Sequence, residues 1–287
     1  MRVNVGEDEE ESRSGGAQLS IADDHQLAWQ LAHEAGRRLL ALRADGDVAP
    51  ETLRDAGDWL SHEYLAAELT RLRPHDAVLS EEGTDDTARL AARRVWIVDP
   101  LDGTREFGEP GRTDWAVHVA LWQDGDLVAG AVALPAEDRV LSTWQPEHLP
   151  NRMDEPAPLR LVISRSRPPA FISRVAAGLD AVEVPMGSAG AKAAAVITGQ
   201  ADAYVHSGGQ YEWDSAAPVA VATAAGLHAS RIDGSPPRYN QPDPKLPDIL
   251  ICRVELAPRL LAAISAATGS DPVPLSCGPT SAQREQS

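Results

Sequence analysis

Apolar residues recur at helical spacing in two segments near the start of the chain. Leucines and alanines return every three or four positions across residues 21–43, and a similar pattern covers residues 58–72. Positions three and four apart lie on one face of an α-helix, so each segment can bury one face. We predict two amphipathic helices, joined by a loop that contains Pro50 and several carboxylates.

Five short runs of β-type sequence follow the two helices. Residues 77–79 and 95–98 are apolar and lead directly into carboxylates, whereas residues 115–122, 127–134 and 139–143 alternate in part between apolar and polar positions. A period of two is typical of β-strands. The first half of the chain is therefore expected to pack its helices on an antiparallel or mixed sheet.

The second half of the chain alternates strand-like and helix-like segments. The predicted strands are residues 159–163, 182–185, 202–206 and 249–254, and the predicted helices are residues 171–179, 189–197 and 215–225. Such alternation indicates a sheet with helices packed on it.

Composition divides the chain into two folded halves between two tails. Residues 1–18 combine like charges with Gly and Ser, and residues 269–287 are also polar, so both are predicted to be disordered. Residues 146–158 are rich in proline and are predicted to be a linker. It separates an N-terminal α+β half, residues 19–145, from a C-terminal α/β half, residues 159–268.

Net charge and cysteine content exclude several classes of protein. A formal net charge of −17 argues against nucleic acid as a partner, because phosphate backbones are bound by Lys and Arg. No apolar run reaches the roughly 18 residues of a membrane span, and the acidic N-terminus is unlike a signal peptide. Cys252 lies in an apolar run and Cys277 in a polar tail, which does not suggest a disulfide framework. We predict a cytoplasmic protein whose acidity is largely a solvated surface.

The strongest chemical signal is a turn with two carboxylates directly after an apolar strand. In the sequence WIVDPLDGT, Asp99 and Asp102 stand three positions apart, and Pro100 stiffens the turn between them. Two such carboxylates brought together would repel each other, and a divalent cation between them would remove the conflict. Gly103 and Thr104 would place backbone N–H groups beside that cation, as a phosphate seat. Taken alone, the motif could equally be a turn with an aspartate cap.

Two further acidic motifs are weak when each is taken alone. Glu81 and Glu82 follow a short strand, but paired glutamates usually lie on a solvated surface. Asp214, in the sequence EWDSAAP, stands at the start of an alanine-rich segment, where aspartate is a common helix cap.

Together, the three motifs resemble the inositol monophosphatase superfamily. An E-E pair after a strand, then D-P-L-D-G-T, then W-D-x-A-A-P occur in the order found in that family, and the resemblance covers nearly the whole chain between the tails. It implies an α+β (mixed α/β) fold of the sugar and inositol phosphatase type. In that fold, a layered αβαβα sandwich, two sheets have helices packed between them and outside them.

The resemblance also implies a set of metal ligands and a catalytic group. The ligands shared among two or three Mg²⁺ ions would be Glu81, Asp99, the main-chain carbonyl of Leu101, Asp102 and Asp214. Thr104 and Glu81 would position the attacking water, with Asp58 as their acidic partner. Asp55 stands where the related pattern has a threonine. Inhibition by lithium is expected on the same ground.

Substrate contacts follow from resemblance to one branch of that family, the CysQ-type phosphatases. The segments SRSR and GSAGAK match its substrate-contacting turns, and REFGEPGR and GSPPRYNQPD also resemble it. The residues implied to bind substrate are Gly103, Thr104, Ser164, Arg167, Gly187, Lys192 and Asp214. Arg167 replaces a more familiar histidine, and a guanidinium suits phosphate. Lys192 could instead be a solvated helix lysine, and Tyr239 could stack on a base or simply pack.

The resemblance implies hydrolysis of the 3′-phosphate of 3′-phosphoadenosine 5′-phosphate to give AMP, in sulfur metabolism. The sulfated precursor is a further candidate substrate. Alternatives are an inositol-1-phosphatase or fructose-1,6-bisphosphatase of broad specificity, a non-catalytic binder of phosphonucleotide or metal, and a protein in which the acidic motifs are only caps and turns. The expected partner is a small anionic phosphorylated substrate rather than nucleic acid or membrane, and a homodimer is left open.

Overall fold

The computed structural model describes residues 15–44, 49–148 and 158–269 of the 287-residue chain. The helices are α1 Gly15–Ala44, α2 Pro50–Leu72, α3 Thr104–Gly108, α4 Ile172–Leu179, α5 Ala189–Ile197, α6 Glu212–Ala224 and α7 Ala257–Thr268. The strands are β1 Ala77–Ser80, β2 Arg94–Asp102, β3 Ala116–Gln123, β4 Asp126–Leu134, β5 Arg139–Ser142, β6 Leu159–Ser164, β7 Ala181–Met186, β8 Ala203–Ser207, β9 His228–Ser230 and β10 Asp248–Cys252. Short 3₁₀ helices cover Thr87–Ala91, Pro135–Glu137 and Val254–Leu256.

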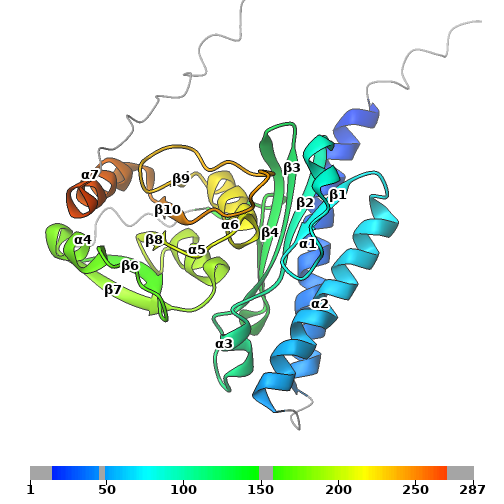
Figure 1. Cartoon of the computed structure of the whole chain (residues 1–287), viewed down its shortest axis with the longest axis horizontal. Coiled ribbons are helices and arrows are strands. Elements are labelled where there is room, and N and C mark those ends of the chain that lie inside the picture. The colour runs from blue at the N-terminus through cyan, green and yellow to red at the C-terminus, as the bar shows by residue number, and fades with distance from the viewer. Residues whose placement is uncertain (1–14, 45–48, 149–157, 270–287) are drawn as a thin grey trace, which may run out of the picture.

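The strands form two five-stranded mixed sheets (Figure 1). The first has the order β1-β2-β3-β4-β5, in which β1 and β2 are parallel and the other neighbours are antiparallel. The second has the order β7-β6-β8-β10-β9, in which β6 is parallel to β7 and β8, and β10 is antiparallel to β8 and β9.

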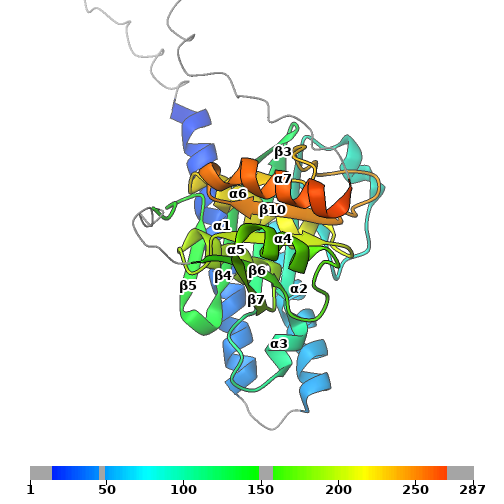
Figure 2. The same ribbon diagram turned by 90° about the vertical axis from the view of Figure 1, so that its left-hand side faces the viewer.

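Helices and sheets alternate in five layers. The helices α1 and α2 cover the outer face of the first sheet, α5 and α6 lie between the sheets, and α4 and α7 cover the outer face of the second sheet (Figure 1). Figure 2 shows α4 and α7 lying across the second sheet. This arrangement confirms the predicted αβαβα sandwich.

The first sheet is buried on both faces because helices cover each of them. Along β2, Trp96 and Val98 contact the cluster under α1 and α2, whereas Val95 and Ile97 contact the cluster around α5 and α6. A strand covered on both faces reads as a continuous apolar run. The sequence of β2 therefore lacks alternation. The prediction that the strand ends at residue 98 and is followed by a turn is wrong: β2 continues through Pro100 to Asp102, with a register shift between Asp99 and Asp102.

Several element boundaries differ from the predicted ones. The prediction that Pro50 lies in a loop is wrong: it is the first residue of α2, where its fixed φ fits a helix start and its missing N–H is not needed. Helix α1 begins at Gly15, earlier than the expected start at residue 21. The predicted elements did not include α7 or β9.

Much of the predicted tails and linker lies outside the described residues. This applies to residues 1–14, 149–157 and 270–287, so the boundaries proposed for them stay predictions. Among the described helices, none has both the length and the apolar composition that crossing a membrane requires.

Candidate active site

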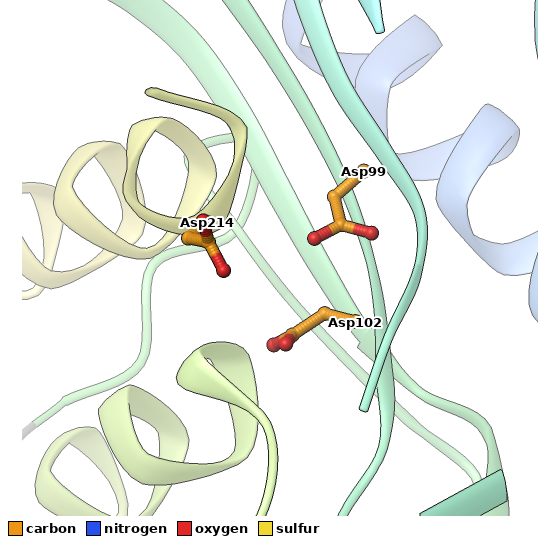
Figure 3. Close-up of side chains that lie close together, drawn as sticks. All are labelled: Asp99, Asp102 and Asp214. Atoms are coloured by element: carbon orange, nitrogen blue, oxygen red, sulfur yellow. The ribbon is translucent and has the colours of Figure 1, made fainter. Parts of the chain in front are cut away.

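Three aspartates from two layers of the fold converge on one point. Asp99 and Asp102 lie at the end of β2, and Asp214 lies in the first turn of α6. One carboxylate oxygen from each lies within 4.8 Å of the others. In Figure 3 the three side chains point into a common space between the strand and the helix.

An irregularity in β2 allows Asp99 and Asp102 to face this space together. Asp99 pairs with His118 and Asp102 with Ala116, so the register against β3 shifts between the two aspartates. Such a shift bends a strand and redirects its side chains. The N–H of Leu101 donates to Oδ1 of Asp99 (3.1 Å) and so fixes the irregularity from inside.

The aspartates line a cavity of about 260 Å³ between the two halves of the molecule. Of the residues predicted to act in catalysis, metal binding or substrate binding, every one except Asp58 lines this cavity. They are Glu81, Asp99, Leu101, Asp102, Gly103, Thr104, Ser164, Arg167, Gly187, Lys192 and Asp214. The structure thus brings the predicted residues together, while their individual roles stay predictions.

Crowding of the carboxyl groups perturbs their pKa values. Loss of water and then the charges of neighbouring carboxylates raise the pKa of Glu81 to about 8. The same causes raise the pKa of Asp214 to about 6 and hold that of Asp99 well above its usual value. These carboxyl groups oppose one another's ionisation, and a divalent cation bound between them would relieve the repulsion. Their oxygen atoms are the ligands that a hard divalent cation prefers.

Asp102 differs from its neighbours because hydrogen-bond donors surround it. Its Oδ2 accepts from the hydroxyl of Ser188 (2.5 Å) and the N–H of Gly190 (2.8 Å), and lies 3.2 Å from Nε2 of His118. Burial alone would raise the pKa of Asp102, but the charge and hydrogen bond of His118, helped by Lys192 and Ser188, hold it at about 2. Asp102 therefore remains ionised.

Asp58 reaches the site through a threonine. The hydroxyl of Thr104 lies 3.2 Å from Oδ1 of Asp58 and 3.0 Å from the carbonyl oxygen of Leu101, and it can donate to either. Burial, followed by the charge of Glu82, raises the pKa of Asp58 to about 7, against the hydrogen bond from Thr104. The geometry matches the predicted pairing of Thr104 with Asp58.

Lys192 is buried, so its alternative interpretation as a solvated helix lysine is wrong. The side chain lies at the wall of the cavity, 4% exposed, and its Nζ donates to the carbonyl oxygens of Gly187 (3.0 Å) and Ser188 (2.5 Å). Burial lowers the pKa of Lys192 to about 8. Its ammonium thus holds the turn before α5 and adds positive charge behind the cavity wall.

The turn after β6 is held to helix α3 by a charged cluster that the sequence did not reveal. Arg165 donates to Glu106 at 2.7 Å and 3.1 Å, and to Glu109 at 2.9 Å and 3.0 Å. These contacts join segments about 60 residues apart. Nothing in the sequence of either segment indicates that the arginine of SRSR pairs with the glutamates after the Asp-Gly-Thr motif. Arg167, the predicted substrate contact, lies exposed at the cavity, and its N–H donates to the hydroxyl of Ser164 (3.1 Å).

Two buried polar residues of the cavity were also missed. His206 and Gln210 line it from the second half of the molecule, and neither belongs to a recognisable motif. Tyr239 is buried, with its hydroxyl 3.3 Å from that of Ser215, which agrees with its interpretation as a packing residue.

Comparisons with known proteins agree with this geometry. Residues 25–268 match the model of the inositol monophosphatase family. The 3′-phosphoadenosine 5′-phosphate phosphatase of Mycobacterium tuberculosis is 53% identical over 247 residues, 82% of this chain and 90% of that protein. The 3′(2′),5′-bisphosphate nucleotidase CysQ of Escherichia coli is 31% identical over 228 residues, 73% of this chain and 91% of that protein. The structure of CysQ from Bacteroides thetaiotaomicron superposes with a TM-score of 0.68 at 27% identity, covering 84% of this chain and 98% of that one.

Proposed function

The chain belongs to the inositol monophosphatase family, and we propose that it is a Mg²⁺-dependent phosphatase that removes the 3′-phosphate of 3′-phosphoadenosine 5′-phosphate and leaves AMP. The observation that carries the proposal is the convergence of three aspartates in a cavity that Arg167 and Lys192 also line. Acidic groups suit cations, and basic groups in the same cavity suit a second anionic group of the substrate. The name of the mycobacterial relative supports the choice of substrate.

The residues proposed to hold two or three Mg²⁺ ions are those whose oxygens line the acidic wall. They are Glu81, Asp99, the carbonyl of Leu101, Asp102 and Asp214. When bound, such ions lower the pKa of a water molecule and offset negative charge on the phosphate. The ionised state of Asp102 and the crowded carboxyls beside it support this assignment.

The protein's own part in the reaction is to orient the attacking water through hydrogen-bond acceptors. If Thr104 donates its hydroxyl proton to Asp58, the oxygen lone pairs of Thr104 are free to accept a hydrogen bond from water. Glu81, which lines the same cavity, would accept a second hydrogen bond from the water. When both hydrogens of the water are donated to fixed acceptors, the orientation of its oxygen lone pairs is also fixed. Such an orientation is the geometric requirement for attack on phosphorus.

The substrate is proposed to lie across the cavity between the two halves of the fold. Gly103 and Thr104 would hold the phosphate that leaves, and Ser164 and Arg167 would contact the second phosphate. Gly187 lines the same cavity, and a Cβ there would lie 2.4 Å from the side chain of Glu106, so this position requires glycine. The proposed reaction belongs to sulfur metabolism, and assembly into a homodimer is a further prediction.

Identification of the product tests the position of cleavage. The purified protein is incubated with Mg²⁺ and 3′-phosphoadenosine 5′-phosphate, and the nucleotide product is separated and compared with adenosine 5′-phosphate and adenosine 3′-phosphate. We expect the 5′-phosphate, with no turnover after removal of divalent cations by chelation. Formation of the 3′-phosphate, or turnover that survives chelation, would contradict the proposal.

A further inference from the structure

A buried arginine belongs to a hydrogen-bonded group that connects two segments, each carrying a predicted metal ligand. Arg89 is 1% exposed and lies in the 3₁₀ helix Thr87–Ala91, shortly after Glu81. Its Nε and Nη2 donate to the two carboxylate oxygens of Asp85 (2.6 Å and 3.0 Å). This two-pronged contact fixes the loop that follows Glu81, because a planar guanidinium matches a carboxylate with both hydrogen bonds at once.

The other side of the same guanidinium reaches a segment about 150 residues further along the chain. Nη1 donates to Oδ1 of Asn240 (2.7 Å), and Nη2 donates to the carbonyl oxygen of Gln241 (2.9 Å). In return, Nδ2 of Asn240 donates to the carbonyl oxygen of Arg89 (3.2 Å). These two residues belong to the segment GSPPRYNQPD, for which the proposed reaction gives no role.

The chain of hydrogen bonds continues to the helix that carries Asp214. The carboxylate of Glu212, 1% exposed, accepts from the N–H groups of Asn240 (2.6 Å) and Gln241 (2.8 Å). Glu212 is the first residue of α6, and Asp214 follows in the same turn. Asp85, Arg89, Glu212, Asn240 and Gln241 thus form one connected group, which we call the Arg89 clasp.

The clasp connects two parts of the site that lie outside the strands. The first sheet also contacts both of them, through the N–H of Glu81 to the carbonyl oxygen of Val98 (3.4 Å) and through His118 to the carbonyl oxygen of Trp213 (3.1 Å). Asp99 and Asp102 are held by the first sheet, whereas Glu81 lies just beyond β1 and Asp214 lies on a helix between the sheets. The clasp ties the loop after Glu81 to the start of α6. Arg89 bonds to the loop directly and to α6 through Asn240 and Gln241, which bond to Glu212, so the buried group is suited to hold the two segments at a fixed separation.

We propose that Arg89 is a positioning residue for the metal site, which acts by holding the Glu81 loop against the first turn of α6. The inference rests on the proposed use of Mg²⁺ by this chain, but not on the identity of the phosphorylated substrate. Lysine in place of Arg89 keeps the charge but cannot form the two-pronged contact with Asp85 and also reach Asn240.

The test compares Arg89→Lys with Arg94→Lys as a matched control. Arg94 also bridges three acceptors, in Asp24, Asp76 and Gln123 at 2.7–2.9 Å, but it lies at the opposite end of β2 from the aspartates. Mg²⁺ binding is measured by calorimetry without substrate, and turnover is measured over a range of Mg²⁺ concentrations. We expect Arg89→Lys to weaken Mg²⁺ binding about tenfold, the size typical of groups that support metal ligands, with kcat at saturating Mg²⁺ changed less than threefold.

Three outcomes would overturn the inference. They are wild-type Mg²⁺ affinity in Arg89→Lys, an equal loss of affinity in Arg94→Lys, or a loss of kcat that saturating Mg²⁺ does not restore. If Arg89→Lys does not fold, Asp85→Ala replaces it, since the Asp85 side chain is 34% exposed. That variant should weaken Mg²⁺ binding in the same direction, and unchanged affinity would overturn the inference. A wild-type protein that binds Mg²⁺ but does not cleave the nucleotide would refute only the proposed substrate.

Discussion

Replacing Asp102 by asparagine should remove a metal ligand without disturbing its surroundings. Oδ2 of Asp102 accepts two hydrogen bonds, from the hydroxyl of Ser188 and the N–H of Gly190. Both partners are donors at this position, so the asparagine must place its oxygen there. Its NH₂ group then replaces Oδ1, and an amide nitrogen does not coordinate a hard cation. The orientation of the variant side chain is therefore fixed by the protein.

The expected loss of activity can be bounded. Removal of one charged oxygen from the cavity should lower kcat/KM at least about 100-fold, which corresponds to about 2.7 kcal/mol of transition-state stabilisation. The fold should persist because the two hydrogen bonds to Ser188 and Gly190 remain. One negative charge fewer also reduces the repulsion that raises the pKa of Asp99 and Glu81.

Three measurements decide the outcome for Asp102→Asn. Steady-state kinetics at several Mg²⁺ concentrations give the loss of kcat/KM, calorimetry gives Mg²⁺ affinity, and circular dichroism with thermal melting verifies that the protein is folded. A folded variant that retains activity within tenfold of wild type and binds Mg²⁺ normally would refute the assignment of Asp102 as a ligand.

Three other substitutions test separate parts of the site. Lys192→Met keeps the volume of the buried side chain but removes its charge. In steady-state kinetics, KM for a nucleotide bisphosphate should rise about tenfold and KM for inositol 1-phosphate much less. Equal changes in the two KM values would contradict this expectation. Asp58 has a pKa of about 7 and accepts the hydrogen bond from Thr104 most strongly when it is ionised, so kcat/KM should fall as pH drops below 7. Asp58→Asn should lower the activity and abolish this acidic limb, and a limb that survives in the pH profile of the variant would show that another group causes it. Gly190→Ala would place a Cβ 2.2 Å from Nε2 of His118. The free energy of unfolding, measured in urea, should therefore fall by about 1–3 kcal/mol. Wild-type stability of this variant would contradict the packing described.

The local positions of the acidic motifs could be predicted from the sequence, whereas the set of metal ligands was implied only by the family resemblance. The pair Asp99 and Asp102 follows an apolar strand, although β2 continues through Pro100 instead of turning there, and Asp214 stands where a helix begins. Pro50 could also have been placed correctly by local rules, since proline is favoured at the first position of a helix.

Features that depend on distant segments could not be read from the sequence. Lys192 looks like a surface lysine in an alanine-rich helix, and it is buried only because α5 lies between two sheets. Arg89 lies in the polar stretch TARLAARR, where nothing indicates that residues about 150 positions later will cover it. The contact of Arg165 with Glu106 is another pairing across the two halves. In each case the environment of a charged group is set by tertiary packing rather than by its neighbours in sequence.

Substrate preference is decided by comparing kcat/KM for Mg²⁺-dependent phosphate release from three substrates. These are 3′-phosphoadenosine 5′-phosphate, inositol 1-phosphate and fructose 1,6-bisphosphate, assayed with the same protein at saturating Mg²⁺. We expect a preference of at least about 100-fold for the nucleotide, equivalent to about 2.7 kcal/mol of difference in transition-state binding. Comparable values for the three substrates, or a preference for either sugar phosphate, would contradict the nucleotide assignment.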